Sequence, residues 1–472
     1  MASEKSIMWF RQDLRLKDNP ALREALASGP TIAVYILDDE SAGDHQHIGA
    51  SRLWLHHALT ALESSLNGKL LCLKGNSTLI LQSLCAQHNV ASVYSSFCCE
   101  PWRIRQDEEV REALAEQNVQ FHQLNSSFLW WPQEINKPDG SPYKVFTPFY
   151  RRGCLTAKQP RKPLLTADTG KLVQINMPEA GIAKLRLLSG KSWEERVLKS
   201  WQVSEEGAEK QLLTFLKEGL TGYKNGRNYP SLPHISKLSP FLRHGQISPN
   251  TVWWAVANQE PTPDNDHFLS EIGWREFSNN LLFHNNKLPE ENFRADFSQF
   301  EWEEDPQVIK RWQRGETGVP IVDAGMRELW QTGFMHNRVR MIVASYLTKN
   351  LRQHWRAGAN WFWKTLVDAD LANNSASWQW VAGCGADAAP YFRIFNPVTQ
   401  AQKFDPEGVY IKTYLPELKR LSGNDLFAPW QAPQQSLLNA GVLLGENYPK
   451  PMIDLAASRK AALAAYEAMK GK

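Results

Sequence analysis

The sequence predicts a doubly wound α/β domain with a parallel sheet at the N-terminus, followed by a linker and an all-helical domain. Over the first 130 residues, short apolar runs of strand length alternate with helical patterns, which is typical of a parallel sheet covered by helices. From residue 192 onwards, apolar residues recur at helical spacing and the strand pattern does not return. The intervening residues have no clear period, which indicates a connector. We therefore expect domains at residues 1–130 and 192–472, joined by a linker at residues 131–191.

Five apolar runs are expected to form the strands, at residues 6–10, 32–37, 70–73, 91–94 and 120–124. Helical patterns lie between them at residues 20–27, 51–66, 77–88 and 103–117. On such a sheet, ligands bind at the carboxyl ends of the strands. No GxGxxG follows the first strand, so a dinucleotide site of the usual kind is not indicated.

The second part of the chain is expected to be helical throughout. Helical spacing covers residues 205–220, 249–257, 268–286, 306–314, 321–331, 337–354, 361–367 and 456–472. The linker before it contains residues that interrupt helices and strands, such as the two prolines of Gln-Pro-Arg-Lys-Pro at residues 159–163. A connector of this kind is expected to wrap over the surface.

Composition indicates a soluble, globular, cytoplasmic protein. Apolar residues make up 42%, and no run approaches the roughly 18 apolar residues of a membrane helix. The N-terminus has no apolar signal core. Six cysteines without a CxxC pair favour reduced thiols and no metal site. The net charge is only +3, so any affinity for nucleic acid must come from a local basic patch. We expect a monomer without an obligate protein partner.

Residues 368–397 concentrate chemistry-bearing side chains. Three acids, three asparagines, two tryptophans and an arginine are interleaved there with apolar residues, so part of the segment should be buried. Buried acids need partners, and the nearest candidates are Arg338 and Arg340. A structural Arg–Asp pair inside a helical domain is the simpler interpretation. The density of Trp and Asn around this pair favours a flat ligand.

The chain resembles the photolyase/cryptochrome flavoprotein family from the run Met8 to Leu16 to its final helix, and the match is closest to the bacterial cyclobutane pyrimidine dimer photolyases. The specific motifs are Trp378-Gln379-Trp380 and the run Ala389-Pro390-Tyr391-Phe392-Arg393-Ile394-Phe395-Asn396-Pro397. The resemblance implies that the helical domain binds flavin adenine dinucleotide (FAD). It also implies light-dependent repair of UV-damaged DNA, in which photoexcited reduced FAD gives an electron to a flipped-out dimer. This activity is that of a deoxyribodipyrimidine photo-lyase, a carbon–carbon lyase.

The resemblance also assigns residues to the flavin. Positions that match the family's FAD-binding residues are Tyr223, Ile235, Ser236, Lys237, Leu238, Ser239, Glu271, Arg275, Asn337, Arg340, Asp368, Asp370 and Asn374. Serine hydroxyls and backbone N–H groups can hold a pyrophosphate. Ile235 departs from the family pattern, which has Thr there. Asn374 matches the residue that faces flavin N5, where an amide favours repair over sensing.

Lesion binding is implied for side chains on two predicted helices and on the Trp motif. Glu271, Trp274 and Arg275 share one helix face, and Asn337 and Met341 share a face on another. By resemblance, Trp274 and Trp380 flank the thymine dimer, and Met341 packs against it. Glu271 and Asn337 would hydrogen-bond the base edges and stabilise the dimer radical anion. Asn and Met at the two facing positions favour the cyclobutane dimer over the (6-4) photoproduct.

Two further sets of residues follow from the resemblance. DNA phosphates would meet Arg227, Arg275, Arg338 and Arg393. An electron-transfer chain would run from the flavin outwards through Trp378, Trp355 and Trp302. Most of the 19 tryptophans are expected to be core residues, but the match of these positions in order favours the relay.

A second, antenna chromophore is also expected. Residues 49–57 and 142–149 look like those of the class III photolyases, a subgroup that uses methenyltetrahydrofolate. Glu100-Pro101 is also similar to relatives that bind 8-hydroxy-5-deazaflavin, which is the alternative. We favour the folate.

Two other functions compete with repair. A cryptochrome-type blue-light photoreceptor would use the same flavin and tryptophans with little or no repair. The absence of a long C-terminal extension, together with Asn374, Glu271 and Met341, argues against it. A flavin electron-transfer enzyme with a soluble donor would need a nicotinamide site, and none is visible in the sequence.

Overall fold

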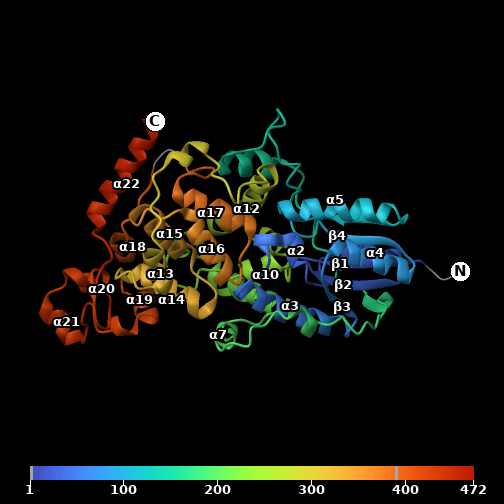
Figure 1. Cartoon of the computed structure of the whole chain (residues 1–472), viewed down its shortest axis with the longest axis horizontal. Helices are drawn as coiled ribbons and strands as arrows, with labels where there is room; N and C mark the ends of the chain where they lie inside the picture. The colour runs from blue at the N-terminus through green and yellow to red at the C-terminus, as the bar shows by residue number, and fades with distance from the viewer. Residues whose placement is uncertain (1–3, 389–391, 472) are drawn as a thin grey trace. The chain divides into compact units, whose positions relative to one another are not determined.

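The computed structural model describes residues 4–388 and 392–471, drawn in Figure 1. The chain divides into two compact units. The first unit comprises Met1–Leu220, Ser236–Asn286 and Val367–Ala372. The second unit comprises Thr221–Ile235, Lys287–Leu366 and Asn373–Lys472. Each unit is thus assembled from separate stretches of sequence, and the domain boundaries given above stay a prediction.

A five-stranded parallel sheet forms the centre of the first unit, as predicted. Its strands are β1 (Lys5–Phe10), β2 (Thr31–Leu37), β3 (Leu70–Lys74), β4 (Val90–Ser96) and β5 (Gln120–Leu124). The order is β3-β2-β1-β4-β5, and every neighbouring pair is parallel. The chain therefore moves outwards from β1 on one side and then crosses to the other. This reversal places the topological switch point between β1 and β4.

Helices cover the sheet, and the inner strands β1 and β2 are buried on both faces. All residues of β2 are buried, which is why this strand reads as an almost continuous apolar run. One face packs Ile7, Val34 and Val93 against Leu84 and Val110 of the covering helices. The helices of the first unit are α1 (Pro20–Ser28), α2 (Asp39–Ala42), α3 (Ala50–Ser65), α4 (Ser77–His88), α5 (Pro101–Ala115), α6 (Phe146–Pro148), α7 (Trp193–Leu198), α8 (Glu205–Thr214), α10 (Ser239–His244), α11 (Pro249–Ala257) and α12 (Pro263–His284).

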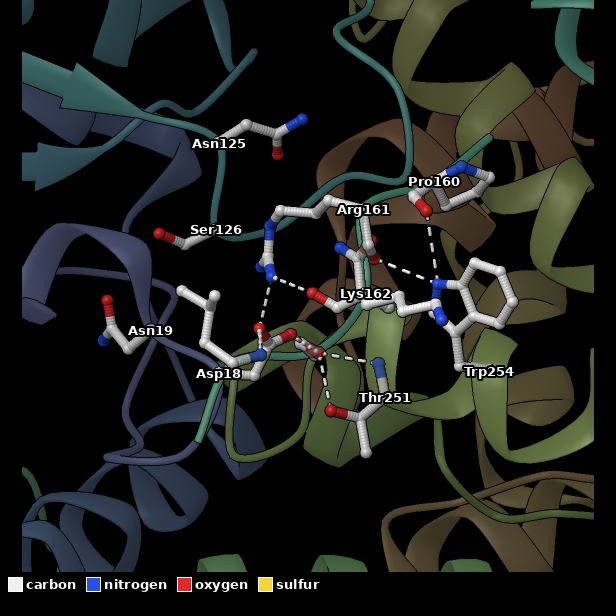
Figure 2. Close-up of polar contacts among 12 residues, drawn as sticks. Asp18, Asn19, Asn125, Ser126, Pro160, Arg161, Lys162, Thr251 and Trp254 are labelled. Atoms are coloured by element: carbon white, nitrogen blue, oxygen red, sulfur yellow. Dashed lines mark hydrogen bonds and ion pairs between the residues drawn. The ribbon is translucent and has the colours of Figure 1, made fainter. Parts of the chain in front are cut away.

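The predicted linker is mostly irregular and is bound to the first unit by specific hydrogen bonds. Figure 2 shows the main attachment, where Trp254 Nε1 donates to the carbonyls of Pro160 and Arg161 at 3.2 and 3.0 Å. Asp18, fully buried, accepts from the guanidinium of Arg161 and from the backbone N–H of Leu164 at 2.8 Å. The linker is therefore anchored at a buried carboxylate.

The described residues of the second unit form helices, loops and isolated bridges. Its helices are α9 (Tyr223–Gly226), α13 (Pro306–Arg314), α14 (Pro320–Thr332), α15 (Asn337–Ser345), α16 (Trp355–Thr365), α18 (Pro397–Phe404), α19 (Val409–Tyr414), α20 (Gly423–Phe427), α21 (Gln434–Ala440) and α22 (Leu455–Lys470). Helix α17 (Leu371–Ala382) begins in the first unit and continues in the second.

The predictions of helices at residues 337–354 and 361–367 were wrong in their boundaries. Helix α15 passes into a π-helical turn, Tyr346–Asn350, and the helical backbone ends there. Arg352 then has a left-handed φ of 49°, which a helix cannot continue through. His354 caps the next helix by accepting from the N–H of Arg356 at 3.2 Å, so α16 begins at Trp355.

All six cysteines are buried and free of disulfides. Within residues 4–388 and 392–471, no helix combines the length and the apolarity that crossing a membrane requires.

The anchor at Asp18 yields a stability prediction. Asp18→Ala leaves the guanidinium of Arg161 without its carboxylate, and breaking a buried ion pair typically costs about 3–5 kcal/mol. We expect a loss of this size in the free energy of unfolding, measured by urea titration. The control is Asp44→Ala at an exposed acid, expected to change stability by less than about 0.5 kcal/mol. Equal stability of the two variants would contradict the anchoring role.

Candidate functional site

In the first unit, helix α10 holds the segment that contains Asp368 and Asp370. Ser239 Oγ donates to Asp368 Oδ2 at 2.5 Å, and Asp368 is only 6% exposed. Arg243 Nε donates to the carbonyl of Ala369 at 2.7 Å. The structure thus brings the predicted serine loop and the predicted acids together, although the sequence separates them widely.

The loop before α10 has an unusual backbone. Lys237 has a φ of 50°, in the left-handed region that few side chains adopt. The carbonyl of Ser236 accepts from Gln211 Nε2 at 2.8 Å, and Ser236 Oγ accepts from the N–H of Leu238 at 3.4 Å. Residues held in this region are enriched at ligand sites. The left-handed backbone at Lys237 is therefore typical of a loop that binds a ligand.

Helix α12 carries Glu271, Trp274 and Arg275. Glu271 lies 3.8 Å from His267 Nε2. Trp274 is half-buried and stacks on Phe146, with ring centroids 3.8 Å apart. Its indole is therefore covered by another ring on one face.

Arg275 has a structural partner that the sequence analysis did not consider. Its Nη1 donates to Glu276 Oε1 at 2.8 Å. Burial raises the pKa of Glu276 to about 7, against the opposing effect of Arg275. The N–H of Leu129 also donates to Glu276, at 2.9 Å. Arg275 thus neutralises a buried carboxylate that ties α12 to the end of the predicted first domain.

In the second unit, Asn374 lies on α17 and its amide is oriented by one hydrogen bond. Asn374 Nδ2 donates to the carbonyl of Ala359 at 3.0 Å, which leaves its Oδ1 as the group for a further donor. Arg340 Nε donates to the carbonyl of Met335 at 2.7 Å, and its guanidinium lies over the ring of Phe334. Tyr223 is buried, with the guanidinium of Arg227 5.5 Å from its ring centre. Ile235 is half-buried.

Helix α16 packs against Trp378, the inner tryptophan of the predicted relay. One face of α16 presents Trp355, Gly358 and Phe362, which are spaced by one helical turn each. A Cβ at Gly358 would lie 2.1 Å from the ring of Trp378, so this face packs directly on Trp378. Phe362 meets Trp378 edge to face at 4.9 Å.

A histidine lies beside the two outer tryptophans of the predicted relay. The ring of His354 lies 5.2 Å from that of Trp302 and 5.7 Å from that of Trp355. Trp355 is buried and donates from Nε1 to Asn292 Oδ1 at 2.8 Å. Burial lowers the pKa of His354 to about 4, so this ring is neutral at physiological pH. Both outer tryptophans thus lie beside a histidine that is neutral at physiological pH.

Three of the predicted phosphate-binding arginines form one positive cluster in the second unit. Burial lowers the pKa of Arg338, and the charges of Arg227 and Arg393 lower it further. Arg338 Nη2 donates to Asn228 Oδ1 at 2.5 Å. Burial, and then the charges of Arg227, Arg338 and Arg340, lower the pKa of His336 to about 3. This concentration of positive charge favours an anionic ligand.

Near that cluster, Trp380 and Arg393 line a cavity of about 50 Å³ that also contacts Lys349. Trp380 Nε1 donates to the carbonyl of Asp387 at 3.2 Å. On α15, Asn337 is exposed and Met341 half-buried. Ala389, Pro390 and Tyr391 of the family-like motif lie outside the described residues.

A group of side chains at the carboxyl edge of the sheet was not predicted from the sequence. Arg11, directly after β1, donates from Nη1 to Asp107 Oδ1 at 2.6 Å. Beside this ion pair, buried nitrogen atoms lack a hydrogen-bond partner among the described residues: Arg103 Nε, Arg243 Nη1, His47 Nδ1 and Gln246 Nε2. Burial, and then Arg243, lowers the pKa of His47. The switch-point rule could have directed attention to this edge.

Aromatic rings adjoin these nitrogen atoms. The ring of His244 stacks on that of His47 at 5.7 Å and on that of Trp54 at 5.9 Å. Trp54 Nε1 donates to Gln246 Oε1 at 2.8 Å. Buried polar atoms without partners are uncommon in proteins, so this edge fits a ring ligand that carries acceptor groups.

Comparison with known proteins gives two family matches. Residues 6–166 match the family described as DNA photolyase, and residues 268–468 match the FAD binding domain of DNA photolyase. A deoxyribodipyrimidine photo-lyase of Agrobacterium fabrum is 42% identical over 98% of this chain and 98% of its own. Cryptochrome-1 of Arabidopsis thaliana is 34% identical over 95% of this chain and 68% of its own. The crystal structure of a class III photolyase from Agrobacterium tumefaciens superposes with a TM-score of 0.93, at 41% identity, over 100% of this chain and 99% of its own.

Proposed function

The chain belongs to the DNA photolyase family, and we propose that it repairs cyclobutane pyrimidine dimers in UV-damaged DNA in a light-dependent reaction. The observation that carries this proposal is the similarity to deoxyribodipyrimidine photo-lyases along nearly the whole chain, which includes both family domains. The helical family domain binds FAD. The role of each individual residue is our proposal.

The residues present fit FAD. In the first unit, the hydroxyl of Ser239 lies on the buried carboxylate of Asp368, after a loop with a left-handed residue. In the second unit, the matching positions carry the amide of Asn374 and the guanidinium of Arg340. When bound in its reduced form, FAD supplies on illumination the electron that opens the dimer. The proposed FAD-binding residues are Tyr223, Ile235, Ser236, Lys237, Leu238, Ser239, Glu271, Arg275, Asn337, Arg340, Asp368, Asp370 and Asn374. Asn374, oriented by Ala359, would offer its Oδ1 to the N5 position.

Lesion binding is assigned to flat and polar side chains. Trp274 and Trp380 would each stack on a base of the dimer, since base–aromatic stacking typically contributes about 1–3 kcal/mol per base. Glu271 and Asn337 would hydrogen-bond the base edges and stabilise negative charge on the dimer. Met341, unbranched and adaptable, would fill the remaining apolar contact.

Binding of the DNA backbone is assigned to Arg227, Arg338 and Arg393. The positive charges of these arginines repel one another, and a phosphate bound between them would offset this repulsion. Arg275 would act differently, because Glu276 already holds it. The net charge of +3 is small, so this cluster would supply most of the electrostatic affinity. A damaged pair is already weakened, which lowers the energy needed to flip the dimer out.

The repair assay tests this function. Oligothymidine containing cyclobutane dimers is mixed with the photoreduced protein, and dimers are counted by chromatography after light or darkness. We expect loss of dimers in light alone. If the fully reduced protein with bound FAD leaves dimers intact in light, the repair proposal is wrong and the photoreceptor function, suggested by the similarity to cryptochrome-1, takes its place.

The relay is tested separately. Trp378→Phe keeps the aromatic packing on Gly358 but raises the energy of the oxidised side chain. We expect photoreduction of oxidised FAD to slow on the order of tenfold or more, while repair by chemically reduced protein stays near normal. Trp430→Phe, the same change at an unassigned tryptophan of the second unit, should affect neither rate. Equal loss of both activities in Trp378→Phe would contradict the relay.

For the second chromophore, we propose methenyltetrahydrofolate bound at the carboxyl edge of the sheet. Acid release and mass spectrometry should identify a folate beside FAD, whereas a deazaflavin would contradict the identity. Arg103→Met should lower the content of this chromophore and leave that of FAD unchanged. Arg105→Met, an exposed neighbour on α5, is the control. If Arg103→Met keeps its full content of the second chromophore, this chromophore does not bind at the carboxyl edge of the sheet.

A further inference from the structure

Trp274 stacks on a residue of the predicted linker, Phe146. The two ring planes are 12° apart and their centroids are 3.8 Å apart. Phe146 is 9% exposed, whereas Trp274 is half-buried. One face of the indole is therefore covered by a buried ring. A pyrimidine that stacks on Trp274 has only the opposite face available.

Phe146 is itself held by rings on two sides. The ring of Tyr150 stacks on it at 5.5 Å with a 10° angle between planes. The ring of Phe277 meets it edge to face at 6.0 Å and meets Trp274 in the same way at 5.7 Å. The stack Trp274–Phe146–Tyr150 is thus braced along its side by Phe277, one turn of α12 after Trp274.

The backbone of both segments is adapted to this stack. Residues Phe149–Gly153 form a π-helical turn, which carries Tyr150 back towards α12. Opposite it, a Cβ at Gly273 would lie 2.5 Å from the ring of Tyr150. Only glycine at this position lets Tyr150 approach α12 so closely. π-Helical turns are frequent at functional sites.

We propose that Phe146 is a positioning residue for lesion binding: it fixes the indole plane of Trp274 and reserves one indole face for the flipped pyrimidine. This inference rests on the proposed role of Trp274 in the repair of dimers. It gives a function to the Phe146–Pro148 segment, which the sequence analysis treated as part of the linker. A freely rotating indole would present its face to the base only part of the time.

The test measures DNA affinity in the dark, so that it does not depend on repair. Fluorescence anisotropy gives the Kd of the protein for an oligonucleotide with one thymine dimer and for its undamaged counterpart. We expect Phe146→Leu to raise the Kd for the dimer about tenfold and to leave the Kd for undamaged DNA unchanged. Phe146→Tyr, which keeps the ring, should restore wild-type affinity. Phe121→Leu, the same change at a ring that packs on Trp9, is the control.

A double-mutant cycle separates positioning from general destabilisation. In the Trp274→Ala background, Phe146→Leu should cause no further loss of dimer affinity, because the indole it positions is absent. Gly273→Ala disturbs the same stack from α12 and should weaken dimer binding in the same direction, which covers the case that Phe146→Leu does not fold. Wild-type affinity in Phe146→Leu, or an equal loss with and without Trp274, would overturn the inference. Unchanged dimer affinity in Trp274→Ala would instead overturn the proposed role of Trp274 itself.

Discussion

The buried carboxylate of Asp368 is the interaction on which the candidate site depends. Ser239 donates to it at 2.5 Å, and the next residue, Ala369, is held through its carbonyl by Arg243. Leaving a buried carboxylate without its donors is expensive, so this short stretch has little freedom. It leads directly into α17, which carries Asn374, Trp378 and Trp380. The hydrogen bonds to Asp368 and Ala369 therefore fix the start of the helix that carries the residues to which we assign flavin contact, electron transfer and lesion stacking.

The sheet was the part of the fold that sequence could predict best. Most positions of a strand that is buried on both faces are apolar, so β2 stands out from its surroundings. The boundary between α15 and α16 was missed because two local features override the apolar period. Arg352 takes a left-handed backbone, and a histidine rather than the usual Ser, Thr, Asp or Asn caps the following helix. The spacing of apolar residues indicates which face of a helix is buried, but it does not indicate where such a cap lies.

The residues of the candidate site could be named from the sequence, but the contacts between these residues could not. Ser239 and Asp368 were both named from family motifs, yet their hydrogen bond joins segments that are distant in sequence. The pairing of Arg275 with Glu276 and the stacking of Phe146 on Trp274 arise from packing in the first unit. The buried nitrogen atoms of Arg103 and Arg243 come from different helices beside one sheet edge. No single sequence motif contains both residues, so their proximity could not be predicted.

The central claim is that light drives an electron from the reduced cofactor of this protein to a bound dimer. The most direct test is the excited-state lifetime of the fully reduced flavin, measured by time-resolved fluorescence with saturating oligonucleotide. Our account predicts that dimer-containing DNA shortens the lifetime and that undamaged DNA of the same sequence does not. Equal lifetimes with both, under conditions where anisotropy shows the dimer bound, would contradict electron transfer to the lesion.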